Sequence, residues 1–226
     1  MNKYKIIAID GPSSSGKGTI AKIVAQKLGF SYLDSGSIYR ALALLVLRYG
    51  YTENDLEKIL DLIKHELSLT FKNDGLYLND ENIEFAIRDE KVGMWASNLG
   101  KNAEIRNNLL SYQKKFAECD NLVTDGRDMG SVVFPQAILK IFLSASAQKR
   151  AERRFNQLQL LGKSVKIQSI LQDIVTRDKQ DSDRSVAPLV FNNTYKMLDN
   201  TELSIEECVD QIISWYQELL ISIHPF

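Results

Sequence analysis

The stretch GPSSSGKGT, residues 11–19, decides the fold. It follows the apolar run IIAI, which is typical of a buried strand, and it opens a segment with apolar residues at helical spacing that ends at Gly29. A glycine-rich loop between a strand and a helix can turn its backbone N–H groups around phosphate oxygens. The sequence therefore predicts a phosphate-binding loop; the alternative is an ordinary Gly/Ser-rich turn.

Within this loop, Gly11, Gly16 and Lys17 match the pattern G-x-x-x-x-G-K, and Lys17 is expected to bridge the outer phosphates of a nucleotide. The loop departs from the strict motif because Gly18 follows the lysine and the hydroxyl residue, Thr19, comes one place later. We expect Thr19 still to lie near Mg²⁺. The residues expected to bind the phosphate donor are Gly11, Pro12, Ser13, Ser14, Ser15, Gly16, Lys17, Gly18 and Thr19.

Strands and helices alternate along most of the chain. Short apolar runs predict strands, and stretches with apolar residues three and four apart predict the helices between them. The predicted strands are 4–9, 30–33, 121–124, 138–143 and 195–198, and the predicted helices include 17–28, 38–49, 148–161, 164–178 and one that begins with a capping box at Ser204 and Glu207. This order predicts an α/β fold with a five-stranded parallel sheet flanked by helices.

Residues 67–87 show a different period. Apolar residues alternate at 67–71, 76–78 and 83–87, and Asn73-Asp74-Gly75 is a turn signal. We expect a small three-stranded antiparallel insert here.

The net charge and the short apolar runs indicate what kind of partner the protein binds. The 226 residues carry 28 Lys and Arg against 29 Asp and Glu, so the net charge of −1 favours a small anionic ligand over nucleic acid. The longest apolar run, residues 41–47, is far shorter than the roughly 20 residues that span a bilayer. We expect a cytoplasmic protein that does not bind a membrane and, without an obvious apolar seam, a monomer.

Two polar stretches follow predicted strands, where an open α/β sheet presents its ligand crevice. DSGSIYR offers Ser35 and Arg40, and DGRDMG offers Asp125, Arg127 and Asp128. Asp125 is placed like an acidic residue that holds Mg²⁺ through water, and arginines suit a phosphate group. The alternatives are a solvated helix arginine at Arg40 and an Asx-type turn in DGRD.

Arginines also gather near the end of the chain. Arg150 and Arg154 share one face of a predicted helix, and Arg177, Asp181 and Arg184 follow at the end of the next one. A lid that delivers arginines stabilises the charge of a phosphoryl-transfer transition state, whereas solvated helix faces are the plainer explanation.

Taken together, GPSSSGKGT, DSGSIYR, DGRDMGSVVFP, KIFLSAS and RDKQDSDRSVAPL resemble the bacterial cytidylate kinases in order and spacing over essentially the whole chain. The resemblance implies a P-loop fold in one domain. Its parts would be a core (about 1–36, 118–146 and 167–226), an NMP-binding arm that contains the β insert (about 37–117) and a helical lid (about 147–166). It also implies transfer of a phosphoryl group from ATP, with Mg²⁺, to CMP or dCMP.

The resemblance assigns roles residue by residue. Arg40, Arg127 and Arg184 would bind the acceptor phosphate, Asp181 the sugar, and Ser97, Arg106 and Asp128 the cytosine edge. The implied acceptor site is Ser35, Arg40, Ser97, Arg106, Arg127, Asp128, Asp181 and Arg184. The implied catalytic residues are Lys17, Arg127, Arg150, Arg154 and Arg177, with Thr19 and Asp125 on the metal side.

Other functions compete with this one. An adenylate or thymidylate kinase, or a kinase for a sugar or shikimate-like acceptor, does not account for DGRDMG together with the insert. A GTP-dependent switch would carry an N-K-x-D motif, which the sequence lacks. A nucleic-acid end kinase would need a basic track that the charge balance does not indicate.

Overall fold

The computed structural model describes residues 4–72, 75–160, 162, 164–184 and 186–223. Backbone contacts divide the chain into two compact units. We call Met1–Leu33 with Phe116–Phe226 the P-loop unit, and Asp34–Lys115 the middle unit. Each is described by itself.

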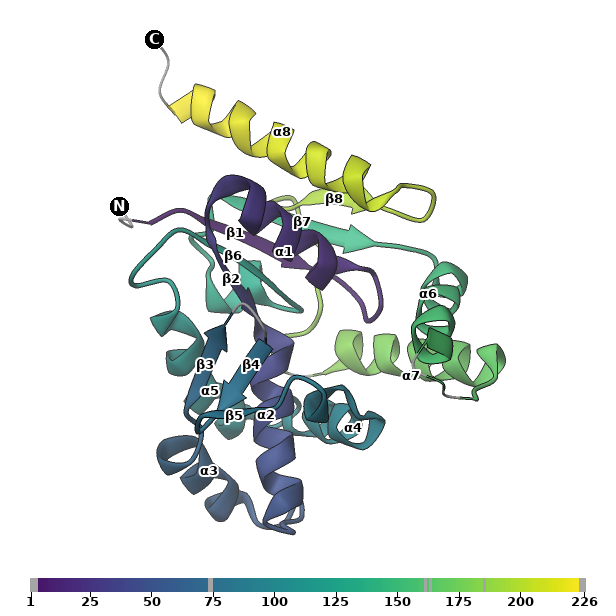
Figure 1. The fold of residues 1–226 in the computed structure, drawn as a ribbon. Helices are drawn as coiled ribbons and strands as arrows, with labels where there is room; N and C mark the ends of the chain where they lie inside the picture. Colours follow the sequence, from purple (N-terminus) through teal and green to yellow (C-terminus); the bar gives the residue numbers. More distant parts are fainter. Residues whose placement is uncertain (1–3, 73–74, 161, 163, 185, 224–226) are drawn as a thin grey trace. The chain divides into compact units, whose positions relative to one another are not determined.

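The large sheet has five strands (Figure 1). Its order is β2-β6-β1-β7-β8, and β1 pairs in parallel with β6 and β7, as β7 does with β8. The strands are β1 (Ile6–Asp10), β2 (Ser31–Asp34), β6 (Leu122–Gly126), β7 (Leu139–Ser144) and β8 (Lys196–Asp199). All five predicted strands are confirmed, with boundaries moved by one or two residues.

The core of the P-loop unit lies between this sheet and two helices, α1 (Lys17–Leu28) and α8 (Ile205–Ile223), which cover the same face. Gly29 ends α1 in the left-handed conformation, as its place after the last apolar residue predicts. The capping box at the start of α8 forms, because the Ser204 hydroxyl and backbone N–H both donate to Glu207.

Two further helices of the P-loop unit, α6 (Ala147–Leu160) and α7 (Ile167–Asp183), pack against each other around a small core of their own. The sequence predicted that the second of these ends at residue 178, and this is wrong: α7 continues to Asp183. The polar run KQDSD contains no glycine or proline, so nothing in it breaks the helix. Residue 161, the predicted end of the first, lies outside the described residues.

The middle unit holds four α-helices and a small sheet among the residues described. The helices are α2 (Ser35–Arg48), α3 (Leu56–His65), α4 (Glu90–Leu99) and α5 (Ala103–Lys115). The antiparallel sheet has the order β3-β4-β5, with β3 (Leu69–Lys72), β4 (Gly75–Leu78) and β5 (Glu81–Asn82). The predicted three-stranded insert is confirmed; residues 73 and 74 of its predicted turn lie outside the described part.

The third strand of the insert was placed wrongly by the sequence. It is Glu81–Asn82, and the 3₁₀ turn η1 (Ala86–Arg88) occupies the end of the predicted run 83–87. Ile83 and Ile87 are both buried, while Phe85 between them is 87% exposed. Ile83 and Ile87 are four residues apart, a spacing that fits both one face of a strand and one face of a helical turn. The backbone forms the helical turn, because the Ile87 N–H donates to the Ile83 carbonyl at 3.0 Å.

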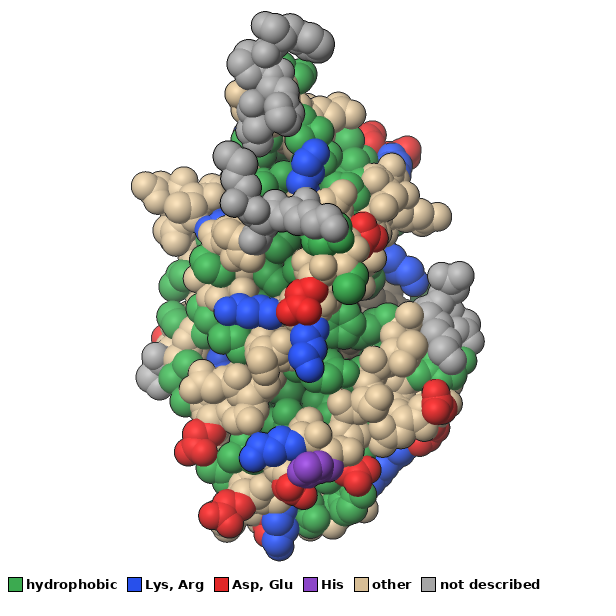
Figure 2. Space-filling view, turned by 90° about the vertical axis from the view of Figure 1, so that its left-hand side faces the viewer, with side chains coloured by type: hydrophobic (Ala, Val, Ile, Leu, Met, Phe, Trp, Pro, Cys, Tyr) green, Lys and Arg blue, Asp and Glu red, His purple; other side chains and the backbone are tan. Residues whose placement is uncertain are grey.

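Charges of both signs are interspersed on the face drawn in Figure 2 and do not gather into a patch of one sign. Within the described residues, none of the helices combines the length and the apolar character needed to cross a membrane.

Candidate phosphate-transfer site

The loop 11–16 connects β1 to α1, as the sequence predicts. Gly11 is required by close packing, because a Cβ on it would lie 2.1 Å from the Leu143 carbonyl oxygen of the neighbouring strand. Gly16, the residue directly before the helix, has φ 87°, a left-handed conformation that glycine adopts without strain. The loop thus reaches the N-terminus of α1, where free N–H groups and the helix dipole favour an anion.

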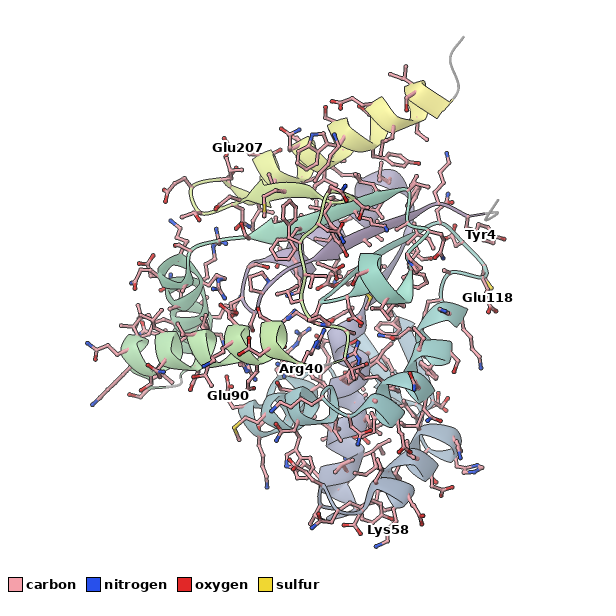
Figure 3. All side chains as sticks on the ribbon, turned by 180° about the vertical axis from the view of Figure 1, so that it is seen from behind. Tyr4, Arg40, Lys58, Glu90, Glu118 and Glu207 are labelled. Carbon is pink, nitrogen blue, oxygen red and sulfur yellow. The ribbon has the colours of Figure 1, made fainter. Side chains whose placement is uncertain are left out.

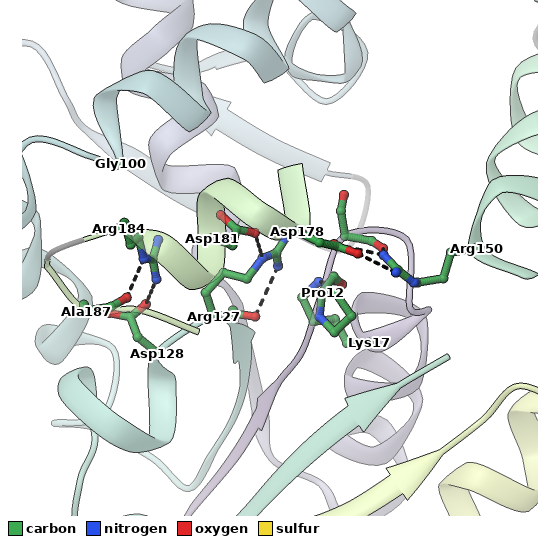
Figure 4. A network of polar contacts seen from close by, with 12 residues as sticks. Pro12, Lys17, Gly100, Arg127, Asp128, Arg150, Asp178, Asp181, Arg184 and Ala187 are labelled. Atoms are coloured by element: carbon green, nitrogen blue, oxygen red, sulfur yellow. Dashed lines mark hydrogen bonds and ion pairs between the residues drawn. The ribbon is translucent and has the colours of Figure 1, made fainter. Parts of the chain in front are cut away.

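Lys17 is the first residue of α1 and is only 8% exposed. Its Nζ donates to the Pro12 carbonyl at 3.1 Å, so the ammonium is held across the loop (Figure 4). The Ser15 hydroxyl is also buried and has no hydrogen-bond partner among the residues that the structure describes. A buried hydroxyl without a partner is costly, and a ligand oxygen in the loop would satisfy it.

The outer side of the loop is held by two residues that the sequence analysis did not assign to the site. The Ser15 carbonyl accepts from Asn200 Nδ2 at 2.8 Å and from the Arg153 guanidinium at 3.3 Å. Arg153 also donates to the Asn200 side chain and backbone carbonyl. Because the two ends of a trans peptide point in opposite directions, holding the Ser15 carbonyl outward turns the Gly16 N–H the other way. An asparagine directly after the last strand was the signal available for this contact.

Arg150 also holds the phosphate loop in place. Its side chain is 5% exposed and forms a two-pronged ion pair with Asp178 of α7, at 3.0 and 2.5 Å (Figure 4). The same guanidinium donates to the Ser13 carbonyl at 3.0 Å. Arg150 therefore joins α6, α7 and the loop, whereas Arg154 and Arg177 are half-buried on α6 and α7.

Asp125, at the end of β6, is buried and accepts from the Tyr32 hydroxyl at 2.7 Å. A Cβ on Gly18 would lie 3.8 Å from its carboxylate, which puts Asp125 beside the first turn of α1. Thr19 is exposed. A carboxylate and a hydroxyl are oxygen donors of the kind that Mg²⁺ prefers, and a single carboxylate suits a metal that keeps most of its waters. Clusters of three or more metal-binding side chains are not found in the described part of the chain.

The stretch DGRDMG forms a pair of crossed contacts with the end of α7. Arg127 Nε donates to Asp181 at 2.6 Å, and Arg184 lies 3.7 Å from the Asp128 carboxylate (Figure 4). Asp128 and Arg184 have side chains only 6% and 10% exposed. The structure therefore brings together four residues that the sequence proposed for one site, although they are about 55 positions apart.

The remaining acceptor candidates lie in the middle unit. The Arg40 guanidinium, labelled in Figure 3, donates to the Ile87 carbonyl at 2.7 Å. Arg106 is buried, donates to the Gly100 carbonyl at 3.2 Å and stacks 5.8 Å from the centre of the Tyr39 ring.

Two serines complete this set. Ser35 is buried and accepts from Gln113 at 2.7 Å, while Ser97 is half-buried on α4. Asp34 caps α2, since its carboxylate accepts from the Ser37 N–H. Asp34 therefore shapes the turn that presents Ser35.

The chain is similar to known proteins over almost its whole length. The family model for cytidylate kinase matches residues 7–218. A cytidylate kinase of Polynucleobacter asymbioticus is 45% identical over 97% of this chain and 100% of its own length, and one of Polynucleobacter necessarius is 47% identical over 96% and 100%. Among solved structures, an uncharacterized protein from Eubacterium ventriosum shares the fold, with a TM-score of 0.55 at 15% identity over 96% of this chain and 99% of that one.

Proposed function

The chain belongs to the cytidylate kinase family, and on this premise we propose that it transfers the γ-phosphoryl group of ATP to CMP or dCMP. A phosphate oxygen of the acceptor attacks the γ-phosphorus in line. The bond from that phosphorus to the β-phosphate oxygen breaks, so the products are ADP and CDP or dCDP. No protein nucleophile is needed, and positioning and electrostatics supply the catalysis.

The donor phosphates would occupy the loop 11–19. The Gly16 N–H, the start of α1 and the Ser15 hydroxyl supply donors, and the Lys17 ammonium would move from the Pro12 carbonyl to the outer phosphates. Mg²⁺, when bound, would neutralise charge on the β- and γ-phosphates. Asp125 would hold it through water, and Thr19 would lie on the same side.

The acceptor phosphate would bind Arg127 and Arg184. In this structure both guanidinium groups face carboxylates, those of Asp181 and Asp128. A phosphate dianion can replace a carboxylate as a partner of arginine, because both accept paired N–H bonds in the same plane. Exchange of partners would then free Asp181 for the sugar hydroxyls and Asp128 for the cytosine edge.

The middle unit would supply the rest of the acceptor site. Arg40 would add a third guanidinium to the phosphate. Arg106 and Ser97 would hydrogen-bond the cytosine edge, which presents an amine beside a ring nitrogen. The buried Arg106 lies over the ring of the half-buried Tyr39, and this contact helps to orient its guanidinium.

Residues 147–166 would act as the lid. Arg150 and Arg154 of this segment, and Arg177 of α7, would lie on the side of the transferring phosphoryl group. Closure would exclude water and so limit hydrolysis of ATP. We also propose that the working protein is cytoplasmic and monomeric. Sedimentation at micromolar concentration tests whether it is a monomer.

The observation that carries the proposal is the cluster of Arg127, Asp128, Asp181 and Arg184, built in the same unit as the phosphate loop. Its test is ADP formation with Mg·ATP and, in separate reactions, CMP, dCMP, UMP, AMP, GMP, dTMP or no acceptor. We expect turnover largely confined to CMP and dCMP. Preference for another monophosphate would refute the acceptor assignments, and ATP binding without turnover on any acceptor would favour a nucleotide switch.

A further inference from the structure

Asp10, the last residue of β1, is a buried carboxylate that the reaction does not use directly. Its exposure is 0%, and it accepts three hydrogen bonds, each of 2.8 Å. The donors are the backbone N–H groups of Met129 and Gly130 and the hydroxyl of Tyr195. A charged group buried at this depth is expensive unless it is fully hydrogen-bonded, so its position is set by these three donors.

The two N–H groups begin a π-helical turn, η2 (Met129–Val133), that follows DGRD. The first N–H groups of a helical turn have no acceptor inside the turn. Here the acceptor is the carboxylate of Asp10, which lies on β1, far away in the sequence. The turn closes back on Asp128, whose carbonyl accepts from the Val132 and Val133 N–H groups at 2.9 and 3.1 Å. The orientation of η2 therefore fixes the backbone of Asp128.

Tyr195 reaches the carboxylate because Gly130 leaves room for it. A Cβ on Gly130 would lie 2.8 Å from the Tyr195 hydroxyl oxygen. Burial, and then the Asp10 charge, raise the pKa of Tyr195, so the phenol keeps its proton and donates it. Burial also raises the pKa of Asp10, while the three hydrogen bonds lower it.

Asp10 is linked both to the phosphate loop and to the turn that carries the acceptor-binding residues. Asp10 is followed directly by Gly11, where the phosphate loop begins, and it holds the turn that follows Arg127 and Asp128. We propose that Asp10 and Tyr195 are positioning residues, which fix the acceptor-binding turn relative to the phosphate loop. The inference rests on the proposed function for the identity of the acceptor, and on the hydrogen bonds for the positioning itself.

Tyr195→Phe is the variant that tests this proposal, since it deletes one donor and keeps the ring. Tyr216→Phe is the matched control, because Tyr216 is a buried tyrosine of the same unit that packs in the α1 and α8 core. Loss of one hydrogen bond to a charged group predicts that the KM for CMP rises about tenfold or more in Tyr195→Phe, with the KM for ATP unchanged. The control should match the wild type in both.

Amide hydrogen exchange measured by NMR gives a readout independent of activity. We expect the Met129 and Gly130 amides to exchange about tenfold faster in Tyr195→Phe than in Tyr216→Phe, with other amides of the β1 to α1 region unchanged. Asp10→Asn replaces an acceptor oxygen with a donor, so three donors can no longer be satisfied, and the loss of kcat/KM for CMP should be larger, about a hundredfold.

The possible failures are distinguishable. If the wild type does not phosphorylate CMP, the proposed function fails, and the exchange rates still decide whether Asp10 and Tyr195 hold the turn. If the wild type does phosphorylate CMP but Tyr195→Phe behaves as the control does in KM and in exchange, the positioning proposal is overturned. Equal losses for CMP and ATP, together with a lowered melting temperature, would also overturn it, because that pattern indicates a purely structural role. These outcomes do not depend on Asp10→Asn being folded.

Discussion

Removal of the Arg150 side chain should destabilise the protein strongly. Arg150 is 5% exposed, and its guanidinium donates to the Ala145 carbonyl, the Ser13 carbonyl and both oxygens of Asp178. Replacing one partner of a buried pair leaves the other charge without compensation, which costs about 3–5 kcal/mol. The Asp178 side chain is 27% exposed, so water softens the loss. We therefore expect about 3 kcal/mol for Arg150→Met.

Urea unfolding followed by circular dichroism measures this directly. For a chain of this length, about 3 kcal/mol corresponds to a fall in melting temperature of roughly 6–12 °C. Gln157→Met is the control, because it introduces the same residue at an exposed position of the same helix. Its effect should stay within about 0.5 kcal/mol.

A double-mutant cycle with Asp178→Asn separates the pair from the rest of the site. The two residues touch, so the double variant should be more stable than the sum of the single losses predicts, by at least about 1 kcal/mol. A loss below 1 kcal/mol for Arg150→Met, or strictly additive losses, would refute the view that this pair ties α6 and α7 to the phosphate loop.

Three further predictions test other parts of the site. Lys17→Ala should lower kcat at least about a hundredfold while the circular dichroism spectrum stays that of the wild type; near-normal kcat contradicts the loop assignment. Arg127→Ala and Asp128→Ala should each raise the KM for CMP about tenfold or more without changing ATP hydrolysis in the absence of CMP, and an equal effect on both would move DGRD to the donor side. Burial raises the pKa of Asp10 above the 3.8 of an unperturbed carboxyl, so folding favours its protonated form. The stabilisation from the protonated carboxyl is complete below pH 3.8 and is lost as the pH rises through the pKa of Asp10 in the folded protein. The free energy of unfolding of the wild type, relative to that of Asp10→Asn, should therefore fall with rising pH in urea titrations. A rise would show that folding lowers the pKa of Asp10.

Local patterns made the phosphate loop and most helices predictable. Gly11, Gly16 and Lys17 act within one loop, and the capping box at Ser204 and Glu207 acts within one turn, so spacing along the sequence is enough to find them. Arg127 and Asp128 were placed at the acceptor site because they follow a predicted strand. Asp181 and Arg184 were assigned to it only by the resemblance to the cytidylate kinases.

Contacts over long sequence separations were not predictable in the same way. Asp10 takes its donors from Met129 and Gly130, whose distance along the chain gives no periodic signal. The partner of Arg150 was also missed, because a helix arginine looks alike in sequence whether it meets solvent, ATP or a buried carboxylate. The helix α4 escaped prediction as well, and it contains Gly93, which weakens the helical signal.

The central claim, that the chain moves the γ-phosphoryl group of ATP onto CMP, is tested most directly by a single-turnover experiment with γ-³²P-labelled ATP. Enzyme in excess over ATP is mixed with Mg²⁺ and CMP, and the products are separated after quenching. The label should appear in CDP, with little in inorganic phosphate. Label found mainly in inorganic phosphate, or left in ATP while CMP is bound, would contradict the account.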